Sequence, residues 1–529
     1  ERLRQEVPEC LQPWYADDFA IMGPARSNAR CFNLLKRWGP SVGYFPSAEK
    51  SFHICPRSNK ARAKEEFEAA GLQVQYTRGH RYVGGFIGLE RMEERWLLPQ
   101  VKLWEDGVKA IAQIPRRYPQ TAYAAFVFSL QAEWQYLCRL CPRAGPHLAP
   151  VEQAIRGALI PALLNLESPI DDDLRRLLGQ GVKRGGLALR DPGEGATRLY
   201  TASREATEPL VASLIGNSPL HHPHHIAKVR AAGRAAREER EEKEAAFMDT
   251  LGRQSPRVKK RLGRVAETGA WLTLMPSRFD GTQLTAEEFR DNLALRYGLR
   301  PRDLPDRCDG CGEHLSIEHG LSCKKGGLVC IRHDDVRDEW ADLAASATTA
   351  ARVSTEPLIF YGGGINASQR ADGNDRRAGD EARGDVAVHG FWTRGRTTIL
   401  DVSICDTDAR AYGNTESKKV LERRARQKVD KYGEACLERR RDFTPLIYSV
   451  DGMPGKEARS AERRLASLLA SKWGRTYSEL VSYVRARMSL AIIRSNTLLL
   501  RGERAHKWRR RSPVQDGAGL RAVGSSRWM

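Results

Sequence analysis

Two short β-prone runs, RGDVAV at residues 383–388 and ILDVSI at residues 399–404, are separated by a turn rich in glycine and arginine. We expect them to pair as an antiparallel hairpin, because two such runs joined by a turn segment are typical of one. The hairpin would bring Asp385 and Asp401 close together. Two carboxylates on neighbouring strands can bind Mg²⁺, which activates water and stabilises a departing oxyanion.

A lysine is expected to complete this acidic pair, by neutralising phosphate charge or by orienting water. Restriction-type nucleases usually carry it two residues after the second acid, where this chain has Ser403. The candidates are instead Lys428 and Lys431, which are followed by Tyr432 in a segment expected to be helical. Their spacing of three residues places both lysines on one face of that helix. Taken singly, each of these residues is also typical of a strand end or a helix surface.

Upstream of the hairpin, four residues have the spacing of metal ligands: Cys308, Cys311, His319 and Cys323. A Cys-x2-Cys turn can bring two thiolates onto one ion, and a second pair a few residues later can close a tetrahedron. Three sulfurs and one nitrogen suit structural zinc, which does not itself imply catalysis. His314 and Cys330 are rival candidates for the fourth ligand.

A second acidic motif lies near the N-terminus, where Asp17 and Asp18 are set within the apolar frame 14–21. Two adjacent carboxylates between β-prone runs predict a hairpin tip that presents a paired acidic site. Such a pair can hold the divalent ions of nucleotidyl transfer. The alternative is a solvated turn, because Asp tolerates turn conformations.

Composition limits the class of protein. The chain has 529 residues, 41% hydrophobic and 29% charged, which fits a globular protein of three or four domains. Its formal net charge of +20 favours a polyanionic partner, by default nucleic acid, although an anionic membrane surface would also fit the charge. No apolar run has the length to span a bilayer and no signal-peptide pattern opens the chain, so we expect a soluble, intracellular protein.

The periodicity of apolar and charged residues predicts a multidomain chain that combines α/β and α parts. Residues 91–215 repeat apolar residues at helical intervals. Residues 226–266 are rich in Ala, Arg, Glu and Lys, and predict a long exposed helix with i,i+4 charge pairs. We expect this helix only to connect the parts of the chain on either side of it. Thr285 and Glu288 have the spacing of a capping box. The predicted segments are 1–90, 91–215, 216–300, 301–330, 331–495 and a basic tail at 496–529.

The N-terminal motifs resemble the late palm motifs of reverse transcriptases from non-LTR retrotransposons. Asp17 and Asp18 match the catalytic metal-binding motif of the palm, Lys50 matches the lysine of the next motif, and 84–85 looks like the primer-grip hairpin. The resemblance implies a partial palm at 1–90, a helical thumb at 91–215 and a helical linker at 216–300. In that family a third metal-binding carboxylate and the fingers lie upstream, so we expect an incomplete polymerase here.

The C-terminal motifs resemble the restriction-like endonuclease of site-specific non-LTR retrotransposons, in which a cysteine-histidine knuckle precedes an Arg-His helix, two strand acids and a Lys-x-x-Lys-Tyr helix. The counterparts here are the 308–323 cluster, Arg332, His333, Asp385, Asp401, Lys428, Lys431 and Tyr432. The resemblance implies a zinc knuckle at 301–330, an endonuclease at 331–495, catalytic roles for the two acids and the lysines, and nucleic-acid contacts from Lys50, Arg332 and His333. Gly384 departs from the proline that the family often has there.

Together these resemblances imply the C-terminal part of a retrotransposon polyprotein. Its endonuclease would nick target DNA with Mg²⁺, and its polymerase would extend the exposed 3′ hydroxyl on element RNA, in the nucleus. One alternative is a catalytically inactive, nucleic-acid-binding remnant of a retroelement. Another is a structure-specific nuclease of DNA repair. The sequence indicates no oligomeric state.

Overall fold

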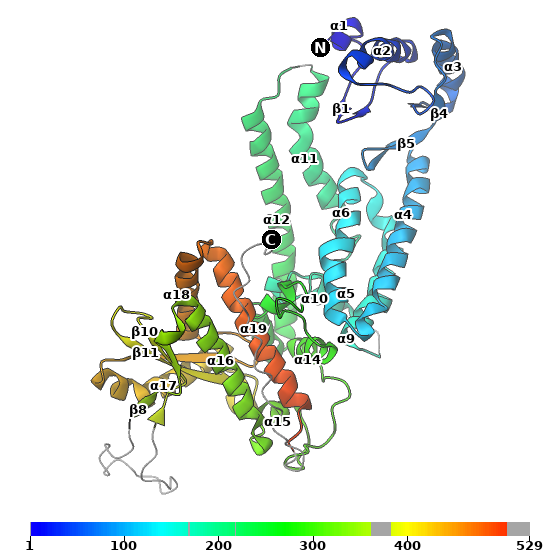
Figure 1. The fold of residues 1–529 in the computed structure, drawn as a ribbon. Coiled ribbons are helices and arrows are strands. Elements are labelled where there is room, and N and C mark those ends of the chain that lie inside the picture. The colour runs from blue at the N-terminus through cyan, green and yellow to red at the C-terminus, as the bar shows by residue number, and fades with distance from the viewer. Residues whose placement is uncertain (1, 168–169, 217, 361–381, 505–529) are drawn as a thin grey trace. The chain divides into compact units, whose positions relative to one another are not determined.

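The computed structural model describes residues 2–167, 170–216, 218–360 and 382–504 (Figure 1). They form a mixed α/β structure that is mostly helical and has small sheets. The chain divides into two compact units. The N-terminal unit contains 1–113, 125–161 and 189–246, and the C-terminal unit contains 114–124, 162–188 and 247–529. The segments predicted at 91–215 and 216–300 therefore contribute to both units.

Short two-stranded sheets and helices make up the start of the N-terminal unit. Strands β1 (Trp14–Tyr15) and β2 (Asp18–Phe19) pair antiparallel, with Tyr15 opposite Asp18, which confirms the predicted hairpin. The elements that follow are α2 (Ala25–Trp38), β3 (Phe52–Ile54), α3 (Lys60–Ala69), β4 (Gln75–Thr77), β5 (Gly79–Tyr82) and β6 (Gly85–Gly88), after α1 (Arg2–Glu6) at the start of the chain.

The β5–β6 hairpin turns through Val83 and Gly84, with Tyr82 opposite Gly85. Val83 has φ +45° and Gly84 has φ +74°, so both turn residues are left-handed. Two left-handed residues are what a tight hairpin turn with the native strand twist requires. The hydroxyl of Tyr136 donates a hydrogen bond to the Val83 carbonyl over 3.1 Å and fastens this turn to the helices of the same unit.

The helical part predicted at 91–215 is confirmed. In α4 (Glu90–Ile111) the buried residues include Leu97, Val101, Trp104 and Val108, which recur at the three- and four-residue spacing of one helical face. Trp104 donates a hydrogen bond to Glu133 over 2.8 Å. The other helices up to residue 254 are α5 (Pro119–Ala125), α6 (Gln131–Leu140), α7 (Ala144–His147), α8 (Ala149–Ala154), α9 (Ile160–Leu164), α10 (Asp172–Gly179), α11 (Ala196–Ile215) and α12 (His222–Gln254).

The long helix predicted at 226–266 is two helices. α12 ends at Gln254, and α13 (Pro256–Val265) begins after Ser255, whose side chain accepts a hydrogen bond from the Arg257 amide. A serine cap followed by proline in the first turn is a helix start, because proline has no amide hydrogen to donate. The predicted i,i+4 charge pairs are present in α12, for example Lys243 with Glu239. The prediction of a mere spanning helix is wrong for α13, which buries Leu262, Arg264 and Val265.

A four-stranded sheet organises the C-terminal unit, in the order β12-β11-β10-β7. Strand β10 (Val386–His389) runs antiparallel to β7 (Val353–Thr355) and to β11 (Thr397–Cys405), and β11 runs parallel to β12 (Asp442–Ser449). Helix α17 (Ser417–Glu438) connects the parallel pair, since parallel strands need a crossover. Strands β8 (Leu358–Phe360) and β9 (Ala382–Arg383) form a separate pair.

Helices cover both faces of this sheet (Figure 1). Leu400 and Val402 point to one face, where they pack with α16 (Leu328–Ala347), α18 (Lys456–Trp473) and α19 (Tyr477–Arg501). Ile399 and Cys405 point to the other face, against α17. Strand side chains alternate between faces, so Asp401 belongs to the face that α17 covers.

Two shorter helices, α14 and α15, precede α16 and the four-stranded sheet in the chain. α14 (Ala286–Tyr297) has the predicted capping box, in which Thr285 and Glu288 exchange side-chain and backbone hydrogen bonds. α15 (Ile317–Ser322) lies within the predicted zinc knuckle. α19 continues to Arg501, past the predicted start of the tail at 496, and residues 505–529 of the tail lie outside the described residues.

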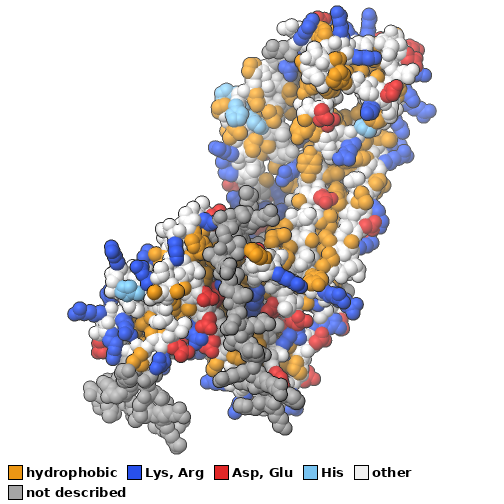
Figure 2. Space-filling view, in the orientation of Figure 1, with side chains coloured by type: hydrophobic (Ala, Val, Ile, Leu, Met, Phe, Trp, Pro, Cys, Tyr) orange, Lys and Arg blue, Asp and Glu red, His pale blue; other side chains and the backbone are white. Residues whose placement is uncertain are grey.

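Basic side chains are spread over the visible surfaces of both units and are mixed with acidic ones (Figure 2). None of the helices in the described part of the chain combines the length and the apolarity that crossing a membrane requires.

Candidate active site and candidate zinc centre

The register of β10 and β11 places the two predicted acids together. Val386 pairs with Leu400, and the Asp385 amide donates a hydrogen bond to the Leu400 carbonyl over 3.2 Å. Asp385 is the residue just before β10 begins, so it lies beside this end of the strand pair. The predicted antiparallel pairing is confirmed, and Asp385 is close enough to Asp401 for its charge to act on that carboxyl.

Asp385 is held by two donors that come from different elements. Its Oδ2 accepts a hydrogen bond from the Val402 amide over 2.5 Å and lies 3.1 Å from Nε2 of His333, which α16 supplies. The hydrogen bond to Asp385 raises the pKa of His333, while burial of the imidazole opposes the rise. These contacts orient the carboxylate and leave its Oδ1 without a hydrogen bond from any described residue.

Asp401 is 3% exposed and carries the second carboxylate. Lys428 of α17 forms an ion pair with it, with Nζ 2.7 Å from Oδ2. The angle between the two groups does not meet the geometry of a hydrogen bond, so Oδ2 has no hydrogen-bond partner among the described residues. Burial raises the pKa of Asp401, and the Asp385 charge adds to the rise while Lys428 opposes it. The site therefore brings two carboxylates together in a partly buried setting, and carboxylate oxygens are the ligands that a hard divalent cation prefers.

The two candidate lysines are placed differently. Lys428 is half-buried and faces the acid pair. Lys431 is exposed, and its Nζ lies 4.9 Å from the centre of the Tyr432 ring, with no contact to either acid. Tyr432 is buried and packs against Phe443, so it anchors this part of α17 to the sheet. Only Lys428 of the two is in position to act with Asp401.

Arg332 and His333, predicted to contact nucleic acid, lie in the second turn of α16. Arg332 is 5% exposed, and its Nη1 has no hydrogen-bond partner among the described residues. Burial lowers the pKa of Arg332 to about 10, while Asp406 and Cys405 oppose that change. A guanidinium buried in this way does not reach a phosphate on the surface, and His333 is engaged by Asp385. This placement fits an internal role for Arg332 and a role for His333 as the partner of Asp385.

The four predicted zinc ligands are gathered at one point. The ligand atoms of Cys308, Cys311, His319 and Cys323 all lie within 4.8 Å of one another. Cys323 Sγ is 3.9 Å from the Sγ atoms of both Cys308 and Cys311, and Cys311 Sγ is 3.2 Å from His319 Nε2. Tetrahedral zinc with bonds of about 2.3 Å separates its sulfur ligands by about 3.8 Å. The cluster could therefore bind a metal such as zinc.

Local backbone geometry builds this cluster. The Cys308 carbonyl accepts a hydrogen bond from the Gly312 amide over 2.8 Å, and Gly312 has φ +79°, which closes the Cys-x2-Cys turn. Ser316 caps α15 through the His319 amide. The pKa of Cys308 is lowered to about 6, because hydrogen bonds from His319 and backbone amides outweigh its burial. A thiol that ionises easily is suited to metal ligation.

The rival ligands His314 and Cys330 do not belong to this group. His314 is exposed and forms an antiparallel bridge with Arg307, and Cys330 is exposed on α16. Within the described residues the structure therefore favours the four ligands that the spacing predicts.

The N-terminal acids Asp17 and Asp18 are exposed at the tip of the β1–β2 hairpin. Burial raises the pKa of the Tyr82 hydroxyl and the Asp18 charge adds to it, which relates this hairpin to the β5–β6 hairpin of the same unit. Lys50 is exposed just before β3. No third carboxylate, histidine or cysteine joins the two acids as a candidate metal group in the described ranges.

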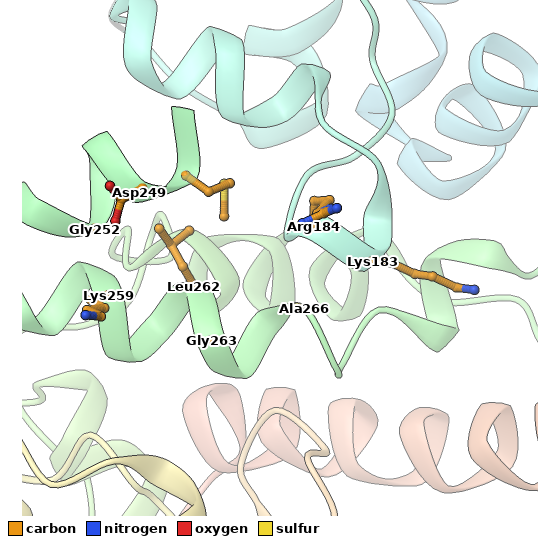
Figure 3. A pocket seen from close by; sticks show the side chains of 9 residues that line it. Lys183, Arg184, Asp249, Gly252, Lys259, Leu262, Gly263 and Ala266 are labelled. Atoms are coloured by element: carbon orange, nitrogen blue, oxygen red, sulfur yellow. The ribbon is translucent and has the colours of Figure 1, made fainter. Parts of the chain in front are cut away.

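A cavity of about 400 Å³ opens between the turn at 182–184 and helices α12 and α13 (Figure 3). Arg184, Asp249, Lys259 and Leu262 contribute to its lining. It shares no residue with the acid pair or with the cysteine cluster. Helix α13 turns Lys259 and Leu262 to this cavity, while Lys260 and Arg264 contact the loop after β11.

Several functional contacts are absent from the sequence prediction. His333 is a partner of Asp385, the Val402 amide is a second one, and Arg264 of α13 contacts the loop after β11. The position of His333 one residue before an acidic run gave no sign of this role. No protein-family model matches the chain, and no curated protein matches it, so function must be argued from this geometry.

Proposed function

We propose that the C-terminal unit is a Mg²⁺-dependent endonuclease that nicks DNA at the site of Asp385, Asp401 and Lys428. The observation that carries the proposal is the convergence of three elements. The pairing of β10 with β11 brings the Asp385 carboxylate to the Val402 amide, next to Asp401, and α17 brings the ammonium of Lys428 to 2.7 Å from Asp401. Residues this far apart in sequence meet at one place on the sheet.

Each group has a task in phosphodiester hydrolysis. A water oxygen attacks phosphorus, the P–O3′ bond breaks, and the products are a 3′ hydroxyl and a 5′ phosphate. Bound at Asp385 and Asp401, Mg²⁺ would activate the water and stabilise the departing oxygen. Lys428 balances charge on the phosphate, while His333 and the Val402 amide keep Asp385 oriented. Burial of Asp401 strengthens these electrostatic interactions.

The order of strands and helices supports a restriction-like endonuclease core. Helix α16 precedes an antiparallel group, α17 crosses over to a parallel fourth strand, and further helices cover the sheet. The cysteine cluster lies directly before α16, in the order of the retrotransposon endonucleases that the sequence resembles. We propose on this basis a retrotransposon protein of the non-LTR class that acts in the nucleus on target DNA and element RNA.

Asp17 and Asp18, at the tip of the β1–β2 hairpin, favour a second part of this proposal, which concerns a polymerase site. Asp17 and Asp18 lie at an exposed hairpin tip, near a second tight hairpin, as the palm of a reverse transcriptase would have them. We propose that these residues belong to a polymerase site, which would need a further carboxylate. The 3′ hydroxyl that nicking produces would be the primer for such a polymerase.

A plasmid-nicking assay tests the endonuclease proposal. Supercoiled DNA is incubated with the full chain and Mg²⁺, and open-circular product is measured over time for the parent, Asp385→Asn/Asp401→Asn and Lys431→Ala. The double variant should be inactive, because it keeps the shape of both side chains but removes their charge. Lys431→Ala should nick like the parent, since it removes a charge from the same helix away from the acids.

If the double variant nicks as fast as the parent, the assignment of the acids is wrong. Salt-dependent DNA binding by a parent chain that does not nick with Mg²⁺ or Mn²⁺ would favour the alternative of an inactive, nucleic-acid-binding remnant. A strong preference for branched junctions over duplex DNA would instead favour a structure-specific repair nuclease.

A further inference from the structure

Helix α13 is packed against the loop that joins β11 to α17. Arg264, 4% exposed, points its guanidinium into this loop. Its Nη1 and Nη2 donate hydrogen bonds to the two carboxylate oxygens of Asp408 over 2.8 and 2.7 Å, and its Nε donates to Asp451. Asp408 lies just after β11 and Asp451 just after β12, so one side chain ties together the ends of the two parallel strands.

A hydrogen-bond chain continues from Arg264 to the start of α17. Nη1 of Arg264 also donates to Oγ1 of Thr407 over 3.1 Å, and this oxygen lies 3.0 Å from Oγ of Ser417, the first residue of α17. Both hydroxyl groups are buried. Lys260, one helical turn earlier in α13, donates to the carbonyls of Thr407 and Gly413 in the same loop.

A second attachment lies just beyond the end of α13. Glu267 forms ion pairs with Lys418, the second residue of α17, over 2.8 Å, and with Arg459 of α18. The segment 256–267 therefore binds the loop, the first turn of α17 and the helix that follows β12. These contacts are unlike those of a helix that only spans between two parts of a chain.

The loop that α13 holds is the connection between the two halves of the candidate site. Asp401 is on β11, four residues before that strand ends, and Lys428 is on α17, eleven residues after the helix begins. An α-helix moves as a rigid rod over this length, so a displacement or rotation at Ser417 is transmitted to Lys428. The distance of 2.7 Å between Lys428 and Asp401 consequently depends on how the start of α17 is fixed.

We propose that Arg264 is a positioning residue that sets the start of α17 and thereby holds Lys428 against Asp401. Its consequence for nicking rests on the proposed endonuclease function, whereas its consequence for the order of α17 does not. A buried guanidinium that forks onto a carboxylate has fixed geometry, which suits it to set a helix at a defined rotation.

The test compares Arg264→Ala, Thr407→Val and Arg257→Ala in the full chain. Thr407→Val is nearly isosteric and interrupts only the chain from Arg264 to Ser417, so it is expected to fold where Arg264→Ala could fail. Arg257 is exposed on the same helix, and its removal is the matched control. Amide hydrogen exchange of peptides covering 406–432 is measured in each variant, together with the kcat and KM of plasmid nicking.

Arg264→Ala and Thr407→Val should each accelerate exchange in 406–421 by at least tenfold, with exchange in the β10–β11 hairpin unchanged. They should lower the kcat for nicking at least tenfold with the KM for plasmid unchanged, and Arg257→Ala should change neither. Unchanged exchange in 406–421 for Thr407→Val would overturn the proposal, and so would an increase spread evenly over the unit. If the parent chain does not nick, the exchange result still decides the positioning role, and the failure belongs to the endonuclease assignment.

Discussion

Substituting Glu462 by glutamine should change how the stability of the C-terminal unit depends on pH. Glu462 lies on α18, is 4% exposed, and accepts a hydrogen bond from the Tyr448 hydroxyl over 3.0 Å. Trp340 of α16 donates to the same hydroxyl over 3.2 Å. The three side chains thus join two helices to β12, but Oε2 of Glu462 has no partner among the described residues.

Burial raises the pKa of Glu462 from 4.5 to about 7. At about 1.36 kcal/mol per pKa unit, the ionised carboxylate costs the folded state about 3 kcal/mol. The folded carboxyl binds its proton more tightly than the unfolded one, so this cost is absent below about pH 4.5, grows as the pH rises, and is complete above about pH 7. The neutral amide of the Glu462→Gln variant resembles the protonated acid and has no such dependence.

The assay is urea unfolding at pH 5, 6, 7 and 8, followed by circular dichroism, for the parent, Glu462→Gln and Glu422→Gln. The free energy of unfolding of Glu462→Gln relative to the parent should increase by about 2.5 kcal/mol between pH 5 and pH 8, because part of the cost is already present at pH 5. Glu422 is exposed on α17, and its substitution should give a constant difference. Parallel curves for the parent and Glu462→Gln across this range would refute a buried carboxyl with a raised pKa.

Three further predictions concern the site and its supports. Lys428→Ala should slow plasmid nicking about 100-fold, as loss of a preorganised charge does in other active sites, and equal rates for Lys428→Ala and Lys431→Ala would contradict the geometry. Cys308→Ser should reduce bound zinc, measured by mass spectrometry of the metal, from about one ion per chain to almost none and lower the melting temperature; full zinc retention would contradict the ligand set. Gly384→Ala should destabilise the unit by roughly 1–3 kcal/mol in urea unfolding, because the new Cβ would lie 2.4 Å from Ile399 Cγ2. An unchanged urea midpoint would contradict this prediction, because it would mean that Ile399 moves aside at no cost.

The same position also has a backbone hydrogen bond that a proline could not make. The amide of Gly384 donates a hydrogen bond to the Pro357 carbonyl over 2.9 Å. A proline at residue 384 has no amide hydrogen and could not make this bond. The chain therefore fixes the residue before Asp385 by a backbone contact with the 357–358 segment.

Features set by neighbouring residues could be predicted from the sequence. The hairpin at Asp17 and Asp18, the capping box of α14 and the cysteine turn depend on contacts within a few residues, and each is present. The acid pair is longer in range, but the pairing of β10 with β11 brings Asp385 to the Val402 amide, next to Asp401. The sequence pattern was sufficient there because the turn between the strands is short.

The choice between Lys428 and Lys431 needed the rotation of α17. Buried residues of this helix include Leu421, Ala425 and Tyr432, and residue 428 falls on the same face by helical spacing. Residue 431 falls to the side of it and is exposed. The information was therefore present in the apolar periodicity, although the three-residue spacing of the lysines alone treats them as equivalent.

The burial of Arg332 on α16 could also be read from the apolar periodicity of its helix. It precedes Val336, Trp340 and Leu343 at the spacing of one buried face of α16, so its burial follows from the apolar stripe. The resemblance assigned it to nucleic acid, whereas the stripe assigns it to the interior. For a residue at the end of an apolar stripe, periodicity is the stronger evidence because it depends on this chain's own packing.

The contacts of Arg264 lie beyond any local pattern, since its partners Asp408 and Asp451 follow it by more than 140 residues. The charged composition of 226–266 hid the helix start at Ser255 and the burial of α13. A boundary placed at residue 331, where the endonuclease motifs begin, would separate Asp408 and Asp451 from their buried cation. Asp408 and Asp451 have side chains that are 37% and 14% exposed, and they would lose the guanidinium that ties the ends of β11 and β12 together. The physical unit that positions Asp401 and Lys428 therefore includes α13, and motif order alone underestimates its extent.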